Sequence, residues 1–221
     1  MELTSSKLAQ MIDHTELKPD ATPNRIRELC QEAIDHGFGA VCVNSCNVML
    51  ASDELAETNV NVCSVVGFPL GAMMTEAKAF EAECAVSNGA HEIDMVMNIG
   101  AMKAGDEELV EEDIAAVVEA SNGKPVKVIL ETGFFTEGEI TAACQLAEGA
   151  GAAFVKTSTG FGPRGASIED VEIMNDAIGG RLGIKAAGGI HTYDEAKAMV
   201  DAGATRIGAS RGIQIIGGAE D

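Results

Sequence analysis

The sequence predicts a closed (β/α)8 TIM barrel, an α/β fold, formed as one domain by residues 1–221. Eight short apolar runs have the pattern of strands, and most are followed by an amphipathic pattern with the period of a helix. This alternation, at a spacing of roughly thirty residues, is typical of parallel βαβ units. A chain of 221 residues has room for eight such units, and no linker or shift in composition marks a second domain.

The expected strands and helices follow one another along the whole chain. The strand-like runs are residues 11–15, 40–44, 60–67, 92–98, 125–132, 154–159, 183–188 and 206–210. The amphipathic segments between them are residues 23–36, 48–57, 74–88, 107–121, 137–149, 168–178 and 193–202. Residues 5–10 are expected to form a short extra helix at the base of the barrel.

Glycines mark the ends of several of these elements. Three helical segments end at glycines that suit a left-handed helix C-cap, namely Gly37, Gly89 and Gly203. Several strand runs end in turns that contain Gly67, Gly100, Gly133, Gly160 and Gly188. Tight loops are therefore expected at the carboxyl ends of the strands, where barrel enzymes place their active sites. A doubly wound open sheet is the alternative, but no Gly-x-Gly-x-x-Gly follows the first strand to support it.

The chain is strongly acidic, with 35 acidic against 15 basic residues and a formal charge of −20. This excess argues against a nucleic-acid partner and against an anionic membrane surface, because both attract a basic face. The acidic clusters at residues 106–108 and 111–113 are expected to be solvated helix faces. A cytoplasm of high salt concentration and an ordinary cytosol both fit this composition.

Salt dependence of stability distinguishes these two settings. If the acidity is an adaptation to salt, the melting temperature should rise substantially between about 0.01 M and about 1 M KCl. The reason is that the Debye length falls from roughly 30 Å to roughly 3 Å and screens the repulsion between carboxylates. A melting temperature that stays flat or falls over that range would indicate ordinary surface composition.

The cysteines and the first residues give no sign of export. None of the six cysteines forms a Cys-x-x-Cys pair, and most lie in apolar patterns typical of buried free thiols. The N-terminal segment has no apolar stretch of the kind found in a signal peptide. No apolar run is long enough to cross a membrane, so a cytoplasmic protein is expected.

Charged residues lie inside the apolar strand runs, opposite the apolar side chains. Three of the nine lysines are placed in this way: Lys127, Lys156 and Lys185. Strand alternation directs them into the barrel together with Asp13, Cys42, Asn44, Asp94 and Glu131. Lysine is rarely buried without compensation, and a desolvated amine becomes a better nucleophile. The pattern predicts a reaction centre, with an internal ion network that only balances charge as the alternative.

Glycine-rich turns after the last three strands predict a phosphate-binding site. They are Gly160-Phe161-Gly162, Gly188-Gly189-Ile190 and Gly208-Ala209-Ser210. In barrels, loops after the seventh and eighth strands often hold phosphate with backbone N–H groups, and glycine lets the backbone approach the oxygens. Ser210 adds a hydroxyl donor and Arg211 a positive charge.

No metal is expected at this site. The four histidines show no His-x-x-x-His or carboxylate–histidine spacing that indicates a metal centre. His14 neighbours Asp13, but strand alternation places the two side chains on opposite faces.

The segment Phe154-Val-Lys-Thr-Ser-Thr-Gly-Phe-Gly162 resembles the Schiff-base strand of the deoxyribose-phosphate aldolase family, a family of class I aldolases. Further segments agree with that family at residues 11–15, 92–100, 126–132, 184–190 and 206–210. The resemblance covers nearly the whole chain. Pro163 and Arg164 depart from it, because many members are rich in glycine and threonine there.

The resemblance implies a role for each matching residue. Lys156 is the amine that forms the imine, Lys185 the ammonium that favours its neutral form, and Asp94 a participant in proton transfer. The family's phosphate contacts match Gly188, Gly189, Gly208 and Ser210, and the expected substrate-binding set also includes Gly160 and Lys127.

The implied reaction is the reversible cleavage of 2-deoxy-D-ribose 5-phosphate to D-glyceraldehyde 3-phosphate and acetaldehyde, a step of deoxyribonucleotide catabolism. It needs no cofactor, because an iminium on the lysine accepts the electrons of the breaking C–C bond. Two alternatives stay open: another barrel lyase or isomerase for a different sugar phosphate, and a barrel whose lysines only hold an anion. Assembly into a homo-oligomer is also left open.

Overall fold

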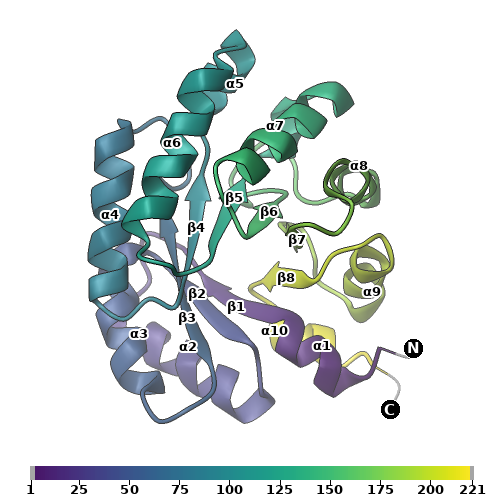
Figure 1. Cartoon of the computed structure of the whole chain (residues 1–221). Helices are drawn as coiled ribbons and strands as arrows, with labels where there is room; N and C mark the ends of the chain where they lie inside the picture. Colours follow the sequence, from purple (N-terminus) through teal and green to yellow (C-terminus); the bar gives the residue numbers. More distant parts are fainter. Residues whose placement is uncertain (1–2, 220–221) are drawn as a thin grey trace.

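The computed structural model describes residues 3–219, which form a closed barrel of parallel strands (Figure 1). Neighbouring strands pair in chain order, and β8 pairs with β1 to close the sheet. The strands are β1 (Ile12–Glu16), β2 (Ala40–Val43), β3 (Asn61–Val66), β4 (Glu92–Val96), β5 (Val126–Ile129), β6 (Phe154–Lys156), β7 (Gly183–Ala187) and β8 (Arg206–Ala209). The barrel predicted from the sequence is confirmed.

Helices follow the strands and surround the barrel (Figure 1). The α-helices are α1 (Ser5–Met11), α2 (Pro23–His36), α3 (Val48–Leu55), α4 (Thr75–Ser87), α5 (Ile99–Ala104), α6 (Glu107–Ala120), α7 (Glu137–Gly149), α8 (Ile168–Ile178), α9 (Tyr193–Asp201) and α10 (Gly212–Ile216). Two short 3-10 helices are η1 (Ser45–Asn47) and η2 (Thr132–Phe134).

Capping residues explain why several helices begin where the sequence predicts. The side chains of Thr22, Thr136 and Ser167 accept hydrogen bonds from backbone N–H groups in the first turns of α2, α7 and α8. These three helices have the predicted bounds. At the end of α2, Gly37 has a left-handed φ of 65°, as the glycine pattern indicates.

The strands β5 and β6 are shorter than predicted, and two helices were missed. After β5 the backbone turns at Glu131, whose φ of 58° lies in the left-handed region and cannot continue a strand. The missed helices α5 and α10 have six and five residues, too few to show an amphipathic period in the sequence.

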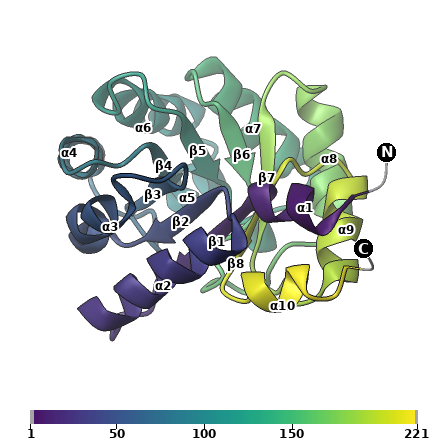
Figure 2. The ribbon, with the colours of Figure 1, turned by 90° about the horizontal axis from the view of Figure 1, so that it is seen from below.

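The short helix α1 contacts α10 and leads directly into β1, and Figure 2 shows both helices next to the side of the barrel formed by β1 and β8. The Ser5 hydroxyl donates to the Ile216 carbonyl oxygen at 3.2 Å, and the Tyr193 hydroxyl donates to the Leu3 carbonyl oxygen at 2.8 Å. These contacts tie the first helix to the last part of the barrel, as expected for an extra helix at its base.

The main apolar core lies between the strands and the surrounding helices, and the barrel interior is largely polar. Inside the barrel, a small cluster of Cys42, Cys63 and Val65 is the apolar part. Four of the six cysteines are buried, as predicted: Cys30, Cys42, Cys63 and Cys144. Within residues 3–219, no helix has both the length and the apolar composition needed to span a bilayer.

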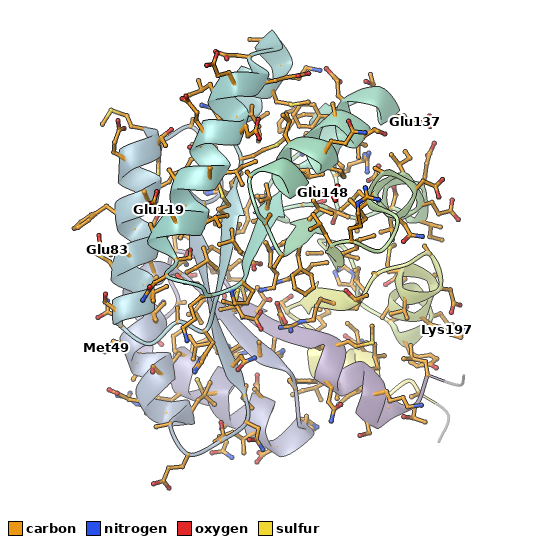
Figure 3. The ribbon with its side chains drawn as sticks, viewed as in Figure 1. Met49, Glu83, Glu119, Glu137, Glu148 and Lys197 are labelled. Carbon is orange, nitrogen blue, oxygen red and sulfur yellow. The ribbon has the colours of Figure 1, made fainter. Side chains whose placement is uncertain are left out.

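Acidic side chains cover the outer helices. Glu83, Glu119 and Glu137 extend away from the barrel (Figure 3). Of the two predicted acidic clusters, residues 106–108, 111 and 112 are exposed, as expected for solvated helix faces. Asp113 was wrongly assigned to such a face, because it is fully buried between α4 and α6. Its position reflects a partner on α4 that the local charge pattern of α6 does not reveal.

That partner is Lys78, a fully buried lysine outside the barrel. Its Nζ donates to Asp113 Oδ2 at 2.6 Å and to the Val96 carbonyl oxygen at 2.9 Å. The Thr75 hydroxyl donates to the other carboxylate oxygen of Asp113 at 3.1 Å. The pair therefore joins α4 and α6 to the carboxyl end of β4.

Replacing Lys78 with methionine is expected to lower the free energy of unfolding by about 3 kcal/mol, because Asp113 would stay buried without its cation. Urea denaturation measures this loss. Lys197→Met is the matched control, since Lys197 forms an exposed pair with Asp201 that should contribute below about 0.5 kcal/mol. Equal losses in the two variants would contradict a special role for the buried pair.

Candidate active site

Strand register gathers the predicted charged residues in the barrel interior. Lys156 on β6 is the register partner of Lys185 on β7, and Asp94 on β4 is that of Lys127 on β5. Asp13 on β1 lies beside Gly208 on β8. Because side chains alternate along a strand, residues at matching registers point to the same face. The interior placement predicted for these four charged residues and for Asp13 is confirmed by their burial and by the salt bridges that join them across the barrel.

The Asp94 carboxylate is the centre of this cluster. Its Oδ2 accepts hydrogen bonds from Lys156 Nζ at 2.8 Å and from Lys185 Nζ at 2.7 Å. Its Oδ1 accepts from Lys127 Nζ at 2.9 Å and from Cys63 Sγ at 3.0 Å. One carboxylate oxygen is therefore shared by the two lysines to which the resemblance assigns the chemistry.

A second layer of charge lies below Asp94 and was only partly predicted. Asp13 pairs with Lys185 and with Arg206, while Glu92 Oε2 accepts from Lys127 Nζ at 2.5 Å and from Arg206 at 3.0 Å. Arg206 and Glu92 each begin a strand, where a charged residue looks like an exposed end. Strand alternation could have identified them, because Glu92 lies two residues before Asp94 and Arg206 two residues before Gly208, so each shares the inward face.

The charges fix the protonation of most of this network. Burial alone would raise the pKa of Asp94, but Lys127, Lys156 and Lys185 hold it well below its usual range. Burial opposes ionisation of Asp13 as well, yet Lys185, with further help from its other cationic neighbours, lowers its pKa to about 2. Both carboxylates therefore remain ionised at neutral pH.

Lys185 and Lys127 remain ammonium ions for the complementary reason. Burial would lower the pKa of Lys185, but the Asp13 and Asp94 carboxylates hold it well above its usual range. Burial also opposes the charge of Lys127, and Asp94 leads the interactions that raise its pKa. The two residues are fixed cations rather than nucleophiles.

A pocket of about 670 Å³ opens at the carboxyl ends of the strands. Lys156 lines it and is 3 % exposed, whereas Lys127, Lys185 and Asp94 are fully buried and are not lining residues. The predicted phosphate turns all reach the pocket, through Gly160, Phe161, Gly188, Gly189, Ile190, Gly208, Ala209 and Ser210. Its remaining lining residues are Thr15, Glu16, Leu17, Lys18, Arg25, Thr159, Ala187, His191 and Arg211.

At two of these positions the surrounding atoms leave too little room for any residue larger than glycine. Gly188 has a φ of 88°, and a Cβ there would come within 3.0 Å of the Gly165 Cα. A Cβ on Gly208 would lie 3.0 Å from Lys185 Cε and 2.9 Å from the Ala187 Cβ. Gly208 therefore leaves room for the Lys185 side chain, in addition to lining the pocket.

Two residues that were predicted to point into the barrel, Asn44 and Glu131, form hydrogen bonds outside the charge network around Asp94. Asn44 donates to the Leu17 carbonyl oxygen at 3.3 Å, and the Glu131 carboxylate accepts from the backbone N–H of Thr159 at 3.2 Å. His14 lies on the outer face of β1, as alternation predicts, with Nε2 at 2.7 Å from Glu32 Oε2.

The donor set does not favour a metal ion among the described residues. Two groups, Cys42–Cys63–Asp94 and Asp13–Cys63–Glu92, bring their ligand atoms within 4.8 Å of one another. Their carboxylates already bind the side chains of Lys127, Lys185 and Arg206. A second cation there would be repelled by these positive charges.

A buried lysine that lines a pocket on the carboxyl face of a TIM barrel defines a class of enzymes that can use a lysine nucleophile. Residues 7–217 match the family model described as DeoC/LacD family aldolase, and the chain belongs to that family. The resemblance seen in the sequence is thereby confirmed.

The chain is similar along almost its full length to proteins named deoxyribose-phosphate aldolase. It is 55 % identical over 212 residues to that of Staphylococcus epidermidis, covering 96 % of each chain. It is 54 % identical over 223 residues to that of Thermococcus kodakarensis, covering 99 % of this chain and 100 % of the relative.

Solved structures of similar proteins have the same fold as this chain. A putative deoxyribose-phosphate aldolase from Coccidioides immitis superposes with a TM-score of 0.94 at 44 % identity, covering 96 % of this chain and 85 % of the other. The Aeropyrum pernix aldolase, whose structure is described as tetrameric, superposes at 0.91 and 32 % identity, covering 97 % and 91 %.

Proposed function

We propose that this chain is a deoxyribose-phosphate aldolase that reversibly cleaves 2-deoxy-D-ribose 5-phosphate to D-glyceraldehyde 3-phosphate and acetaldehyde, with Lys156 as the imine-forming amine. One observation carries the assignment of Lys156. Of the lysines in the buried network, it is the one that also lines the pocket with the glycine turns. The substrate is supported by the names of relatives about 55 % identical to the chain.

The balance of charges in the buried network around Asp94 distinguishes Lys156 from the other cations. Among the described residues of the network, three carboxylates face four cationic side chains. Lys127 and Lys185 each contact more than one carboxylate, and Arg206 contacts both Asp13 and Glu92. Lys156 contacts Asp94 alone. Of the four cations, Lys156 is therefore the one that the carboxylates hold least strongly, which suits a residue that has to act as a nucleophile.

The chemistry then follows from a neutral Lys156 beside a fixed ammonium. Its Nζ attacks the aldehyde carbon C1 of the open-chain sugar, and loss of water leaves an iminium. When the C3 hydroxyl gives up its proton, the C2–C3 bond breaks and its electrons pass into the iminium as an enamine. Glyceraldehyde 3-phosphate departs, C2 is protonated, and hydrolysis releases acetaldehyde.

Asp94 and Lys185 are well placed to assist the reaction at the Lys156 amine. Asp94 holds the Lys156 amine at 2.8 Å, close enough to exchange a proton directly or through one water. Lys185 keeps its positive charge beside the Lys156 amine, and this like charge disfavours the ammonium form of Lys156. Lys127 holds the other oxygen of Asp94, so we propose that it orients Asp94 instead of contacting the phosphate.

The glycine turns and Ser210 suit the phosphate group. They line the same pocket as Lys156, and their backbone N–H groups can approach an anion closely. Arg211 and Lys18 add positive charge at the rim of a chain that is otherwise strongly acidic. The pocket therefore offers a local binding site for an anion that the net charge repels.

Ser210→Asp is expected to raise the KM for deoxyribose 5-phosphate by about tenfold or more, because a carboxylate would repel the phosphate. The KM for unphosphorylated 2-deoxyribose should change by less than about threefold. Steady-state kinetics with both sugars measures this difference. Ser87→Asp, the same change at an exposed site on α4, should alter neither value. Equal losses for the two sugars would remove the β8 turn from the phosphate site.

Borohydride reduction in the presence of acetaldehyde tests the proposed function directly. A Schiff-base aldolase is inactivated by this treatment, and peptide mapping should locate an ethyl group on Lys156. A barrel lyase or isomerase without an imine would stay active and unlabelled. A protein that only binds anions would bind the sugar phosphate without producing glyceraldehyde 3-phosphate.

We further propose that the enzyme acts in the cytoplasm on sugar phosphate from deoxyribonucleotide breakdown, and that it forms a homo-oligomer. The absence of a membrane-spanning helix among the described residues is compatible with this setting. The tetrameric state described for the Aeropyrum pernix relative supports assembly. Sedimentation measures the oligomeric state.

A further inference from the structure

The segment between β6 and α8, residues 157–167, carries one of the pocket's glycine turns. Gly160 and Phe161 line the pocket, although this segment contains no regular helix or strand. Its position must therefore be set by contacts with its neighbours. Those contacts involve two carboxylates to which the resemblance assigns no role.

The first carboxylate, Glu131, holds the beginning of the segment. It is 1 % exposed, it accepts from the Thr159 backbone N–H at 3.2 Å, and it also accepts from the Thr159 hydroxyl. A Cβ on Gly162 would lie 2.6 Å from this carboxylate, so the glycine allows the close approach. Thr159 in turn accepts a hydrogen bond from the Phe161 N–H at 3.0 Å.

The second carboxylate, Asp170 in the first turn of α8, holds the end of the segment through Arg164. The two side chains meet in a bidentate pair, with Arg164 Nη2 at 2.8 Å from Asp170 Oδ1. The buried Thr132 hydroxyl donates to Asp170 Oδ2 at 2.9 Å. The aliphatic part of the Arg164 side chain packs against Gly133, where a Cβ would lie 3.1 Å from Arg164 Cγ. We name Arg164, Asp170 and Thr132 the arginine clamp.

The arginine clamp lies next to the Gly188 turn, which approaches the Gly160 turn so closely that a Cβ on Gly188 would lie 3.4 Å from the Gly160 Cα. The residue after Arg164 is Gly165, and its Cα would lie 3.0 Å from a Cβ on Gly188. The Ala166 N–H donates to the Gly188 carbonyl oxygen at 3.0 Å. We therefore expect a shift of the backbone at Arg164 to disturb both the Gly188 turn and the Gly160 turn.

We propose that Arg164 is a positioning residue for the substrate's phosphate: it holds the Gly160 and Gly188 turns in register through Asp170 and Thr132 without touching the substrate. The proposal rests on the proposed function. Arg164 itself is not among the pocket's lining residues, and its guanidinium is occupied by the Asp170 carboxylate. A direct phosphate ligand would need a guanidinium free to turn toward the pocket.

Asp170→Asn separates positioning from direct binding. A direct role predicts equal or tighter phosphate binding in this variant, because Arg164 would be released from its carboxylate. Positioning predicts weaker binding, since the bidentate charged pair is lost while Arg164 is still present. The asparagine amide keeps an oxygen that can accept from Thr132, which limits the change to the pair with Arg164.

The experiment compares Arg164→Ala, Asp170→Asn and the double variant, using deoxyribose 5-phosphate and unphosphorylated 2-deoxyribose as substrates and inorganic phosphate as a competitive inhibitor. Each variant should show a KM for the phosphorylated sugar, and an inhibition constant for phosphate, raised by about fivefold, with kcat changed by less than about twofold. Kinetics with 2-deoxyribose should be unchanged. The double variant should resemble Arg164→Ala, because both changes break the same pair.

Arg181→Ala is the matched control, because Arg181 forms a similar pair with Glu148 on the outside of the barrel. It should leave every constant unchanged. Equal losses for both sugars in Arg164→Ala, or tighter phosphate binding in Asp170→Asn, would overturn the proposal. Failure of the proposed function would appear separately, as a wild-type protein that does not cleave deoxyribose 5-phosphate.

Discussion

Replacing Lys156 with arginine is expected to lower turnover of deoxyribose 5-phosphate by a factor on the order of 10⁴ or more. Arginine keeps the positive charge but does not become a neutral nucleophile at any working pH, so it cannot form the imine. The loss should appear in kcat and should not be recovered by raising the pH. Borohydride treatment with acetaldehyde should also leave the variant unlabelled.

The barrel should remain folded in this variant, because the guanidinium can still pair with Asp94. The pocket next to Lys156, of about 670 Å³, has space for the larger side chain. Circular dichroism and the melting temperature should therefore stay close to those of the wild type. Lys103→Arg, at an exposed lysine paired with Glu139, is the matched control for the chemical change. Residual aldol activity well above the background rate would exclude Lys156 as the Schiff-base residue.

The sequence predicts the barrel and its inward charges because both depend on local periodicity. Lys127, Lys156 and Lys185 interrupt apolar runs at alternate positions, and the structure buries all three inside the barrel. Periodicity shows which way a side chain points, but it does not show which partner it meets. The convergence of three lysines on Asp94 depends on the stagger between strands up to 91 residues apart in sequence.

The ion pairs that the sequence did not predict depend on contacts between segments that lie far apart in the chain. Arg206 reaches Asp13 across the β8–β1 closure and Glu92 on the far side of the barrel, 193 and 114 residues away. Lys78 looks like a surface lysine in a helical pattern, yet its partner lies 35 residues further on, in a cluster that appears solvated. Arg164 was recognised only as a departure from the family pattern, and its partner Asp170 gives that departure a physical role.

Replacing Lys185 with methionine is expected to reduce kcat/KM at neutral pH by about 100-fold and to move the acid limb of the pH–rate profile to higher pH. Two effects act in the same direction. The repulsion between the two ammonium groups is lost, and Asp94 Oδ2 is left to Lys156 alone instead of being shared. Both effects stabilise the protonated form of Lys156, so less of the amine is available to attack.

The sign of this shift distinguishes an electrostatic role from a structural one. Each carboxylate keeps a cation in the variant, since Asp13 still pairs with Arg206 and Asp94 with Lys127, so the barrel should remain folded. An electrostatic role predicts that most of the activity returns when the pH is raised. It also predicts that Lys185→Arg, which keeps the charge, retains the wild-type position of the acid limb. A loss that is independent of pH would instead mean that Lys185 acts only as packing, and an unchanged profile would remove it from the mechanism.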